Sequence, residues 1–367
     1  MPKTAIFQDY FLVRGGAERL VLTLAEGFPG TTLVHGYRTG ETYPAEAFPD
    51  DTRSLELPHV LRRRGVHLPA LALAFAAQRR FAAGFDLRIF SGVVAPLAAP
   101  ARGRGLNVFY CHTPPRFLYD LKEHYRTPRR NPIRRAAREV MMAWFEARYR
   151  AAIERMDVIV ANSETVRERI RRYLGRDSVV VYPPIDTDRF KGGKVGDYFL
   201  STARLEPLKR VDCIIEAFRQ LPEERLVVLS GGSERARLEA MAEGHPNITF
   251  RGWVEDEELA HLVGGARATI YVPQAEDFGM SPVESMAAGT PVIGVAEGGL
   301  RETIVDGETG VLLPPDFTTG DLVAAVRAMT PDRVLAMRGA CEARAARFSR
   351  ERFLQEMRAL IEEASRR

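Results

Sequence analysis

The sequence predicts two α/β domains in tandem, each built on a parallel β-sheet. The chain has 367 residues, which is too many for one ordinary hydrophobic core and suits two domains. Short β-branched runs alternate with helix-length segments along the whole chain, as they do in βαβ units. Hydrophobic residues make up 46% and charged residues 27% of the chain. This composition is typical of a globular protein.

The predicted strands fall into two groups with one break between them. The first group comprises 4–11, 31–35, 86–91, 106–111, 157–161 and 178–182. The second comprises 198–202, 226–230, 247–250, 268–272, 292–294 and 310–313. The break is the turn-rich segment 183–193, so we expect domains at 1–183 and 184–348. Residues 349–367 predict an amphipathic helix, capped by Ser349, that can cross back to the first domain.

Other features of the chain argue against several classes of protein. The first residues run straight into a strand, without the pattern of a signal peptide, and the longest apolar stretch, 68–77, is far below the roughly 20 residues of a membrane span. Cys111, Cys213 and Cys341 are widely spaced, which favours reduced thiols and a cytoplasmic protein. The net charge is only +4, and we expect no nucleic-acid partner. A complete Gly-x-Gly-x-x-Gly follows neither domain's first strand, which disfavours a dehydrogenase.

The strongest chemical signal is the segment 275–291, AEDFGMSPVESMAAGTP. It follows a predicted parallel strand, at the edge where α/β folds bind ligands. Gly279 permits close backbone approach, and the helix that starts near Ser281 offers backbone amides to phosphate or sugar oxygens. A carboxylate repels phosphate but accepts well from a diol. Glu276 and Glu284, separated by seven residues, therefore indicate recognition of a sugar and a ribose.

This segment resembles the Glu-x7-Glu motif of glycosyltransferase family 4, which comprises retaining enzymes of the GT-B fold. Two further segments match the family in the right order. Residues 203–210, ARLEPLKR, follow the first strand of the second domain, where the family carries an arginine and a lysine that bind the donor diphosphate. Residues 9–19, DYFLVRGGAER, place two glycines between a strand and a helix, as the family's first loop does. The resemblance thus implies a GT-B fold in which the first domain binds the acceptor and the second binds a nucleotide sugar.

The resemblance also implies a role for each matching residue. Arg204 and Lys209 would neutralise the leaving diphosphate without a bound metal or cofactor, Glu276 would hold the transferred sugar, and Glu284 would grip the ribose. The remaining expected contacts to the donor come from Gly16, Trp253, Val254, Gly279, Met280 and Ser281. No enzymic nucleophile is evident, so we expect a front-face reaction that retains the anomeric configuration, with catalysis by positioning and electrostatic stabilisation.

A second motif narrows the expected donor. Residues 110–120, YCHTPPRFLYD, place His112 at a strand end, in a loop stiffened by two prolines. This string resembles the subset of family 4 that transfers mannose in O-antigen and exopolysaccharide assembly. The resemblance implies GDP-mannose as donor, a growing glycan or lipid-linked saccharide as acceptor, and contact of His112 with the transferred sugar.

Two other readings of the whole chain stay open, and two short motifs need interpretation. A GT-B nucleotide-sugar epimerase would need no acceptor, and a non-catalytic sugar-nucleotide-binding subunit would form no product. Asp186 and Asp188 have the Asp-x-Asp form of a metal site in another glycosyltransferase fold, but they lie in the predicted linker and we expect no metal there. The triplet 247–249, NIT, fits a glycosylation sequon that a cytoplasmic protein would leave unmodified.

Arginines crowd the first domain after residue 125. The cluster comprises Arg126, Arg129, Arg130, Arg134, Arg135 and Arg138, continued by Arg148, Arg150 and Arg155. Met141, Met142, Trp144, Phe145 and Tyr149 follow on the same predicted helix. This mixture of basic and apolar residues predicts peripheral contact with the cytoplasmic face of an anionic membrane. In the alternative reading the apolar residues pack in the core and the arginines solvate its edge.

Overall fold

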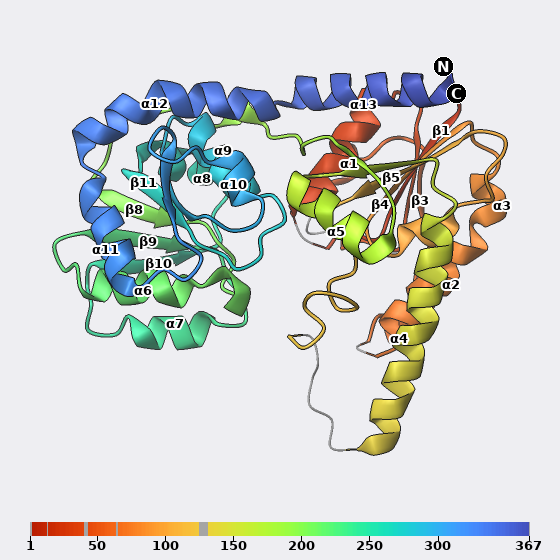
Figure 1. The fold of residues 1–367 in the computed structure, drawn as a ribbon, viewed down its shortest axis with the longest axis horizontal. Coiled ribbons are helices and arrows are strands. Elements are labelled where there is room, and N and C mark those ends of the chain that lie inside the picture. The colour runs from red at the N-terminus through yellow and green to blue at the C-terminus, as the bar shows by residue number, and fades with distance from the viewer. Residues whose placement is uncertain (1, 13, 40–42, 64, 125–130, 367) are drawn as a thin grey trace. The chain divides into compact units, whose positions relative to one another are not determined.

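The computed structural model contains two compact units, which Figure 1 shows as a ribbon. The first unit is Met1–Pro183 with Phe353–Arg367, and the second is Pro184–Arg352. The structure describes residues 2–12, 14–39, 43–63, 65–124 and 131–366. Each unit has its own parallel sheet and its own core.

The first unit is built on a seven-stranded sheet in the order β3-β2-β1-β4-β5-β6-β7, with every neighbouring pair parallel. The strands are β1 Thr4–Gln8, β2 Thr32–His35, β3 Thr52–Ser54, β4 Leu87–Ser91, β5 Leu106–Cys111, β6 Val158–Ala161 and β7 Val179–Val180. The central strands β1 and β4 are buried along their whole length, as strands covered on both faces must be. The sequence did not predict β3, because this edge strand has three polar residues that are mostly exposed.

Helices cover both faces of this sheet. They are α1 Gly16–Gly27, α2 His67–Ala77, α3 Arg79–Ala82, α4 Pro132–Ile153, α5 Glu164–Leu174 and most of α13 Arg350–Ser365. Figure 1 shows α13 lying beside α1. Phe353, Met357 and Ile361 of α13 are buried in the core of the first unit, and Arg358 Nη2 donates to the carbonyl of Gly27 at 2.7 Å. The end of the chain therefore completes the domain in which the chain begins.

The second unit repeats the plan with six parallel strands in the order β10-β9-β8-β11-β12-β13. These are β8 Tyr198–Ser201, β9 Arg225–Leu229, β10 Ile248–Gly252, β11 Ala268–Tyr271, β12 Val292–Val295 and β13 Gly310–Leu313. Its helices are α6 Val211–Arg219, α7 Arg235–Met241, α8 Asp256–Gly265, α9 Met280–Ala287, α10 Leu300–Thr303, α11 Thr319–Ala328 and α12 Pro331–Ala345. The predicted α/β class, with two Rossmann-like parallel sheets, is confirmed.

The strand order of each sheet reverses at one place, between β1 and β4 in the first and between β8 and β11 in the second. In open α/β sheets, ligands bind beyond the carboxyl ends of the strands at such a reversal. The loops that follow these four strands are therefore the places where each unit should carry functional side chains.

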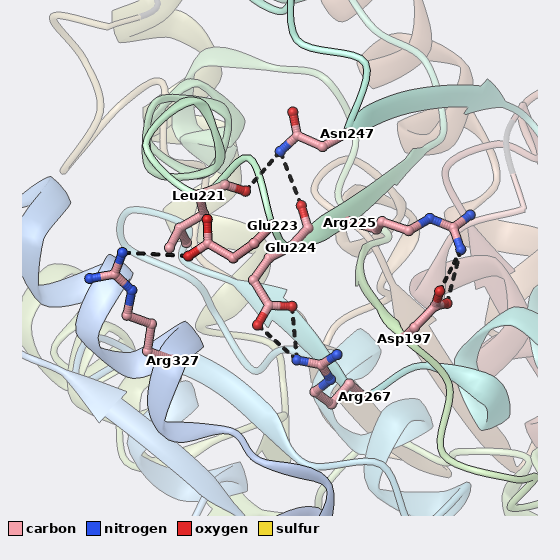
Figure 2. Close-up of polar contacts among 8 residues, drawn as sticks. All are labelled: Asp197, Leu221, Glu223, Glu224, Arg225, Asn247, Arg267 and Arg327. Atoms are coloured by element: carbon pink, nitrogen blue, oxygen red, sulfur yellow. Dashed lines mark hydrogen bonds and ion pairs between the residues drawn. The ribbon is translucent and has the colours of Figure 1, made fainter.

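Polar contacts close the opposite, amino-terminal edge of the second sheet, as Figure 2 shows. Arg267, just before β11, pairs with Glu224 at 2.8 Å, and Arg225, at the start of β9, pairs with Asp197 at 2.9 Å. The Arg225–Asp197 pair ties the starts of the neighbouring strands β9 and β8, and the Arg267–Glu224 pair ties those of β11 and β9, on either side of β8. The carboxyl edge of the same sheet carries the functional loops.

Asn247, the asparagine of the sequon, also forms hydrogen bonds at the amino-terminal edge of the second sheet. Its Nδ2 donates at 3.0 Å to three backbone carbonyls, those of Phe218, Leu221 and Glu224. These bonds fasten the last turn of α6 and the turn after it to the start of β10, and Figure 2 shows two of them. The side-chain amide of Asn247 therefore has a structural role.

Candidate active site

The candidate site lies where the strand order of the second sheet reverses. The loop after β8 and the loop after β11 are joined by backbone contacts: Gln274 N donates to Leu208 O at 2.7 Å. Arg210 adds two bonds, from Nε to the carbonyl of Val272 at 2.7 Å and from Nη2 to that of Pro273 at 3.1 Å. These bonds bring residues more than 60 positions apart into one rigid surface. Sequence reasoning missed Arg210, which reads as one more basic residue beside Lys209.

Three side chains meet on this surface in a closed ring of hydrogen bonds. Lys209 Nζ donates to Glu276 Oε2 at 2.6 Å and to Tyr271 Oη at 2.9 Å. Tyr271 Oη donates in turn to the same Glu276 Oε2 at 3.1 Å. The Lys209 and Glu276 side chains are only 18% and 17% exposed, so water screens their attraction weakly.

The electrostatics of this ring keep its members in defined protonation states. Burial opposes the charge of Lys209, but Tyr271 and Glu276 outweigh burial and raise the pKa of Lys209 above its ordinary value. Burial and the Glu276 carboxylate likewise raise the pKa of Tyr271 well above its ordinary value. Lys209 is therefore an ammonium and Tyr271 a neutral hydroxyl across the physiological range of pH.

The ring leaves two groups for a ligand. Lys209 uses two of its three ammonium protons on Tyr271 and Glu276, so one remains. Both bonds to Glu276 end on Oε2, so Oε1 takes part in neither. Arg204, on the same loop as Lys209, is exposed. A cation donor, a carboxylate acceptor and an exposed guanidinium thus come from one pair of loops.

Tyr271 is a site residue that the sequence reasoning missed. It stands at the last position of β11, within a run of buried residues, and is itself only 6% exposed. An aromatic residue there predicts core packing, and its ring does lie in the core. Only the approach of the loop after β8 turns its hydroxyl into part of the site.

The loop after β11 is held from the other side by the loop after β12. Glu297 accepts from the backbone N–H of Ala275 and lies 3.6 Å from Arg210. Gly299 N donates to the carbonyl of Glu276 at 3.1 Å. A Cβ added to Gly298, whose φ is +56°, would come within 2.2 Å of the same carbonyl. Gly298 and Gly299 therefore let the backbones of the two loops pack against each other. Two consecutive glycines soon after a predicted strand are the sequence signal that could have identified this contact.

The helix predicted near Ser281 begins one residue earlier, at Met280, with Gly279 as its N-cap. Gly279 has a φ of +90°, and a Cβ there would lie 2.6 Å from a Leu300 methyl group. Glycine is therefore required at this position for two separate reasons. Met280, Ser281 and Glu284 are all half-buried on the first turns of α9.

Trp253 and Val254, the predicted base contacts, follow the last residue of β10. The Trp253 side chain is 72% exposed, and Gly231 makes room for it, since a Cβ at 231 would lie 2.8 Å from the indole Nε1. Strand β10 is two places from β8 in the sheet order. An exposed indole at the same edge of the sheet offers a flat face to a ring such as a nucleobase.

The first sheet carries a buried carboxylate at its own reversal of strand order. Asp9, just after β1, accepts from the backbone N–H groups of Val93 at 2.7 Å, Val94 at 2.9 Å and Ala95 at 2.7 Å. Burial raises the pKa of Asp9 to about 6, although these bonds act to lower it. The carboxylate occupies the amides at which an anionic ligand could bind. Sequence reasoning missed Asp9, since a carboxylate after a strand carries no sign of its partners.

His112 follows β5 and shares a hydrogen bond of 2.9 Å between its Nε2 and Ser91 Oγ. Burial lowers the pKa of His112 from 6.5 to about 4. The imidazole is therefore neutral at pH 7, and with Nε2 engaged by Ser91 its other polar atom is Nδ1. Gly16, the first residue of α1, is half-buried. His112 and Gly16 belong to the first unit, whereas the other predicted site residues belong to the second.

Asp186 and Asp188 are both exposed: Asp186 is the N-cap of the short 3-10 helix Thr187–Arg189, and Asp188 lies within it. Asp186 and Asp188 lie before β8, in the segment that opens the second unit. No contact in the described residues connects either one to the ring formed by Lys209, Tyr271 and Glu276.

Comparison with known families assigns the two halves of the chain. Residues 14–189 match the model of Glycosyltransferase Family 4, and residues 184–347 match that of Glycosyl transferases group 1. Each half of the chain thus matches a glycosyltransferase family model, and the fold is GT-B. The matches agree with the predicted family in both halves of the chain, while its mannose-transferring subset stays a prediction.

Curated relatives differ in specificity. The chain is 32% identical over 186 residues to a D-inositol 3-phosphate glycosyltransferase of Xylanimonas cellulosilytica, an alignment that covers 43% of this chain and 45% of the relative. The chain therefore aligns with about half the length of this relative. It is 26% identical over 366 residues to the alpha-1,3/1,6-mannosyltransferase ALG2 of Dictyostelium discoideum, covering 82% of this chain and 84% of that protein.

Solved structures share the fold across the whole chain. HepE of Anabaena, in complex with UDP and glucose, has a TM-score of 0.76 at 18% identity and covers 99% of this chain and 100% of its own. Sucrose-phosphate synthase of Thermosynechococcus elongatus has a TM-score of 0.74 at 20% identity, with 99% of each chain covered. At these identities the likeness shows the fold alone.

The ring of hydrogen bonds predicts the effect of Tyr271→Phe on turnover. The change removes one bond from Lys209 and one from Glu276 while leaving their direct contact. Because hydrogen bonds to charged groups contribute about 1.5–3 kcal/mol, we expect roughly a 10- to 100-fold lower kcat with a smaller change in donor KM. Steady-state release of nucleoside diphosphate measures both.

Tyr198→Phe is the matched control for this variant. It also removes one partly buried hydroxyl bond, from Tyr198 Oη to the carbonyl of Leu262 at 2.7 Å, but at the start of β8. We expect Tyr198→Phe to keep the parent kcat. Equal kcat values for Tyr271→Phe and the parent protein would remove Tyr271 from the site.

The lowered pKa of His112 predicts how a His112→Gln variant depends on pH. A histidine with a pKa of about 4 carries no proton charge above that pH, so its contribution should not change as pH rises from about 5.5 to 8. The ratio of parent to variant turnover should therefore stay constant across this range. His59→Gln, at an exposed histidine, is the control and should match the parent. A ratio that changes several-fold around pH 6.5 would show instead that His112 titrates normally.

Proposed function

We propose that this protein is a glycosyltransferase that transfers a sugar from a nucleoside-diphosphate sugar to a hydroxyl group of a glycan or lipid-linked saccharide, with retention of configuration and without a bound metal. The observation that carries the proposal is the ring of Lys209, Tyr271 and Glu276, beside the exposed Arg204, at the carboxyl edge of the second sheet. It combines cations for a diphosphate with a carboxylate for sugar hydroxyls.

The charges of this ring suit a reaction in which negative charge grows on a leaving group. In the proposed step a bond forms between the acceptor oxygen and the anomeric carbon, and the bond from that carbon to the phosphate oxygen breaks. The acceptor proton passes to the leaving phosphate. Arg204 and the third proton of Lys209 stabilise the charge that develops on the diphosphate, which is the usual role of preorganised donors.

The ring also explains how a carboxylate can stand beside a diphosphate. An isolated carboxylate would repel the phosphates, but the positive charge of Lys209 is 2.6 Å from Glu276 and largely cancels it. Glu276 Oε1 then accepts from a hydroxyl of the transferred sugar without a net electrostatic penalty to the donor. In this proposal Glu284, on α9, binds the ribose, and Trp253 and Val254 flank the base. His112 and Gly16 contribute from the first domain.

The proposed donor is GDP-mannose, and the proposed acceptor is a saccharide on a lipid or a growing glycan at the cytoplasmic face of a membrane. Residues 110–120 motivate mannose through their resemblance to mannose-transferring enzymes, and ALG2 of Dictyostelium is named a mannosyltransferase. HepE of Anabaena, by contrast, was crystallised in complex with UDP-glucose. A direct comparison of the two donors is therefore the decisive test.

A thermal-shift screen with GDP-mannose, UDP-glucose, GDP and UDP tests the donor. A ligand at a hundred times its dissociation constant stabilises a protein by about 2.7 kcal/mol, which such a screen resolves. We expect the largest shift with GDP-mannose. A larger shift with UDP-glucose would identify UDP-glucose as the donor and leave the proposed transfer reaction otherwise unchanged. No shift with any of the four ligands would contradict the proposed function. Product analysis of the bound donor separates transfer from epimerisation and from binding without turnover.

Substitution of Glu276 and substitution of Glu284 should affect binding and sugar transfer differently. Glu284→Gln should weaken binding of free GDP, because it removes a charged acceptor from the ribose hydroxyls. Glu276→Gln should spare that binding, because it releases Lys209 from its carboxylate partner, but it should lower sugar transfer. Isothermal titration calorimetry with GDP and with GDP-mannose measures both effects. The reverse pattern would exchange the two roles.

Turnover should survive removal of divalent metal, because Arg204 and Lys209 supply the positive charge that a metal would otherwise bring to the diphosphate. We expect the rate in excess EDTA to equal the rate in magnesium or manganese. Loss of activity in EDTA with recovery on adding metal would contradict this expectation and would make Asp186 and Asp188 the candidate metal ligands.

A further inference from the structure

Packing alters the basic and apolar surface that the sequence predicts on α4. The prediction that Phe145 and Tyr149 belong to this surface is wrong, because both are fully buried in the core of the first unit. Arg126, Arg129 and Arg130, which the same prediction includes, lie outside the described residues. A further functional feature of the chain lies instead at the carboxyl edge of the second sheet.

Left-handed backbone gathers at this edge. Among the described residues other than glycine, φ lies in the left-handed region at Glu56, Arg210, Ser230 and Ala275. The last three follow β8, β9 and β11, in loops at one edge of one parallel sheet. A residue with a Cβ adopts this conformation at a cost, so the conformation persists only where surrounding contacts hold it. Such strain is typical of functional sites.

Two of these residues are direct neighbours of the ring of hydrogen bonds. Arg210, with a φ of +49°, follows Lys209, and Ala275, with a φ of +54°, precedes Glu276. The backbone conformation of a residue sets the direction in which the chain and the next side chain continue. Glycine would adopt a positive φ without cost, yet the chain has alanine at 275. Another contact must therefore hold Ala275 in this conformation.

Glu297, in the loop after β12, supplies that contact. Its Oε1 accepts from the backbone N–H of Ala275, and its Oε2 lies 3.6 Å from Arg210 Nη2. The Glu297 side chain is only 26% exposed, so water screens these interactions only in part. One carboxylate therefore contacts both of the left-handed residues that adjoin the ring.

The loop that carries Glu297 also holds the other side of Glu276. Gly299 N donates to the carbonyl of Glu276 at 3.1 Å, and Gly298 leaves room for the same carbonyl. Residues 297–299 thus bind the N–H of Ala275 and the C=O of Glu276, on either side of the peptide that joins these two residues. Of these two bonds, only the one to the Glu297 carboxylate comes from a side chain. It is therefore the bond that a substitution can remove.

We propose that Glu297 is a positioning residue for sugar transfer. Its carboxylate holds Ala275 in the left-handed conformation, and Ala275 in turn directs the Glu276 side chain toward Lys209 and the transferred sugar. Glu297 acts through Glu276, because its own oxygens are directed at Ala275 and Arg210. The inference rests on the proposed role of Glu276 in sugar transfer, and it adds a residue outside the motif 275–291.

The turnover of Glu297→Ala is the first measurement. Because a misplacement of about 1 Å can cost roughly 100-fold in rate, we expect kcat to fall roughly 10- to 100-fold. The dissociation constant of GDP should stay within about twofold of the parent value, because free GDP carries no sugar for Glu276 to hold. Glu297→Gln should retain most of the parent kcat, since its amide oxygen can still accept from the N–H of Ala275.

A second substitution separates positioning from a general loss of stability. Glycine needs no contact to adopt a positive φ, so Ala275→Gly in the Glu297→Ala background should restore kcat roughly fivefold or more. Ser230→Gly in the same background is the matched control. It relieves a left-handed residue with a φ of +73° in the loop after β9, and it should restore no activity. Asp306→Ala removes a carboxylate that accepts from the backbone N–H of Leu312, and it should keep the parent kcat.

Three results would overturn the proposal: a kcat of Glu297→Ala within about twofold of the parent value, no recovery with Ala275→Gly, or equal recovery with Ser230→Gly. Circular dichroism and GDP binding show whether each variant is folded. If Glu297→Ala does not fold, Glu297→Asp takes its place in the same comparison, because its carboxylate is one methylene shorter and loses the bond to Ala275.

Hydrogen–deuterium exchange of residues 273–279, measured without ligand, tests the hold on the loop apart from activity. Exchange should be faster in Glu297→Ala than in the parent protein and unchanged in Asp306→Ala. Unchanged exchange in Glu297→Ala would contradict the proposal whatever the activity. If the parent protein transfers no sugar, the proposed function fails and the role of Glu297 in transfer fails with it. If the parent is active, Glu276→Gln is impaired and Glu297→Ala is not, only the role of Glu297 fails.

Discussion

The hydrogen bonds between the loop after β8 and the loop after β11 are the constraint on which the candidate site depends. Gln274 and Arg210 make these bonds with backbone carbonyls, so they fix the path of both loops before any ligand arrives. They are available only because β8 and β11 are neighbours in the sheet although three α-helices and two strands separate them in sequence. The reversal of strand order therefore marks the position of the site and also places its two loops side by side, where they can bond to each other.

Within that frame, the Lys209–Glu276 pair is better understood as a functional device than as a source of stability. Removing two charges from water costs about as much as their attraction returns, so buried ion pairs are weak evidence for stability. Here the pair lies at an edge of the sheet that a ligand can reach, and Tyr271 holds both partners from the core side. Such a pair keeps a cation and a carboxylate ready in one place without a large net charge.

The sequence predicted the parts of this protein that have a local signature. Parallel strands that are covered on both faces appear as apolar runs, whereas the edge strand β3, with its three polar residues, lacks that pattern. Lys209, Glu276 and Gly279 were likewise predicted from motifs. Tyr271, Arg210 and Asp9 were not, because each acquires its role from a segment more than 60 residues away. His112 was predicted as a site residue, but its bond to Ser91 and its neutrality required the fold.

Helix α4 shows the same limit in a sharper form. Its residue types indicated a helix both basic and apolar, but only packing decides which apolar residues face outward. The core of the first unit takes Phe145 and Tyr149, the largest aromatic side chains after Trp144, and leaves Ile133, Val140 and a row of alanines on the opposite side. The two faces share no residue. A substitution at Phe145 would create a cavity in the core, whereas one at Val140 changes only what the helix can touch.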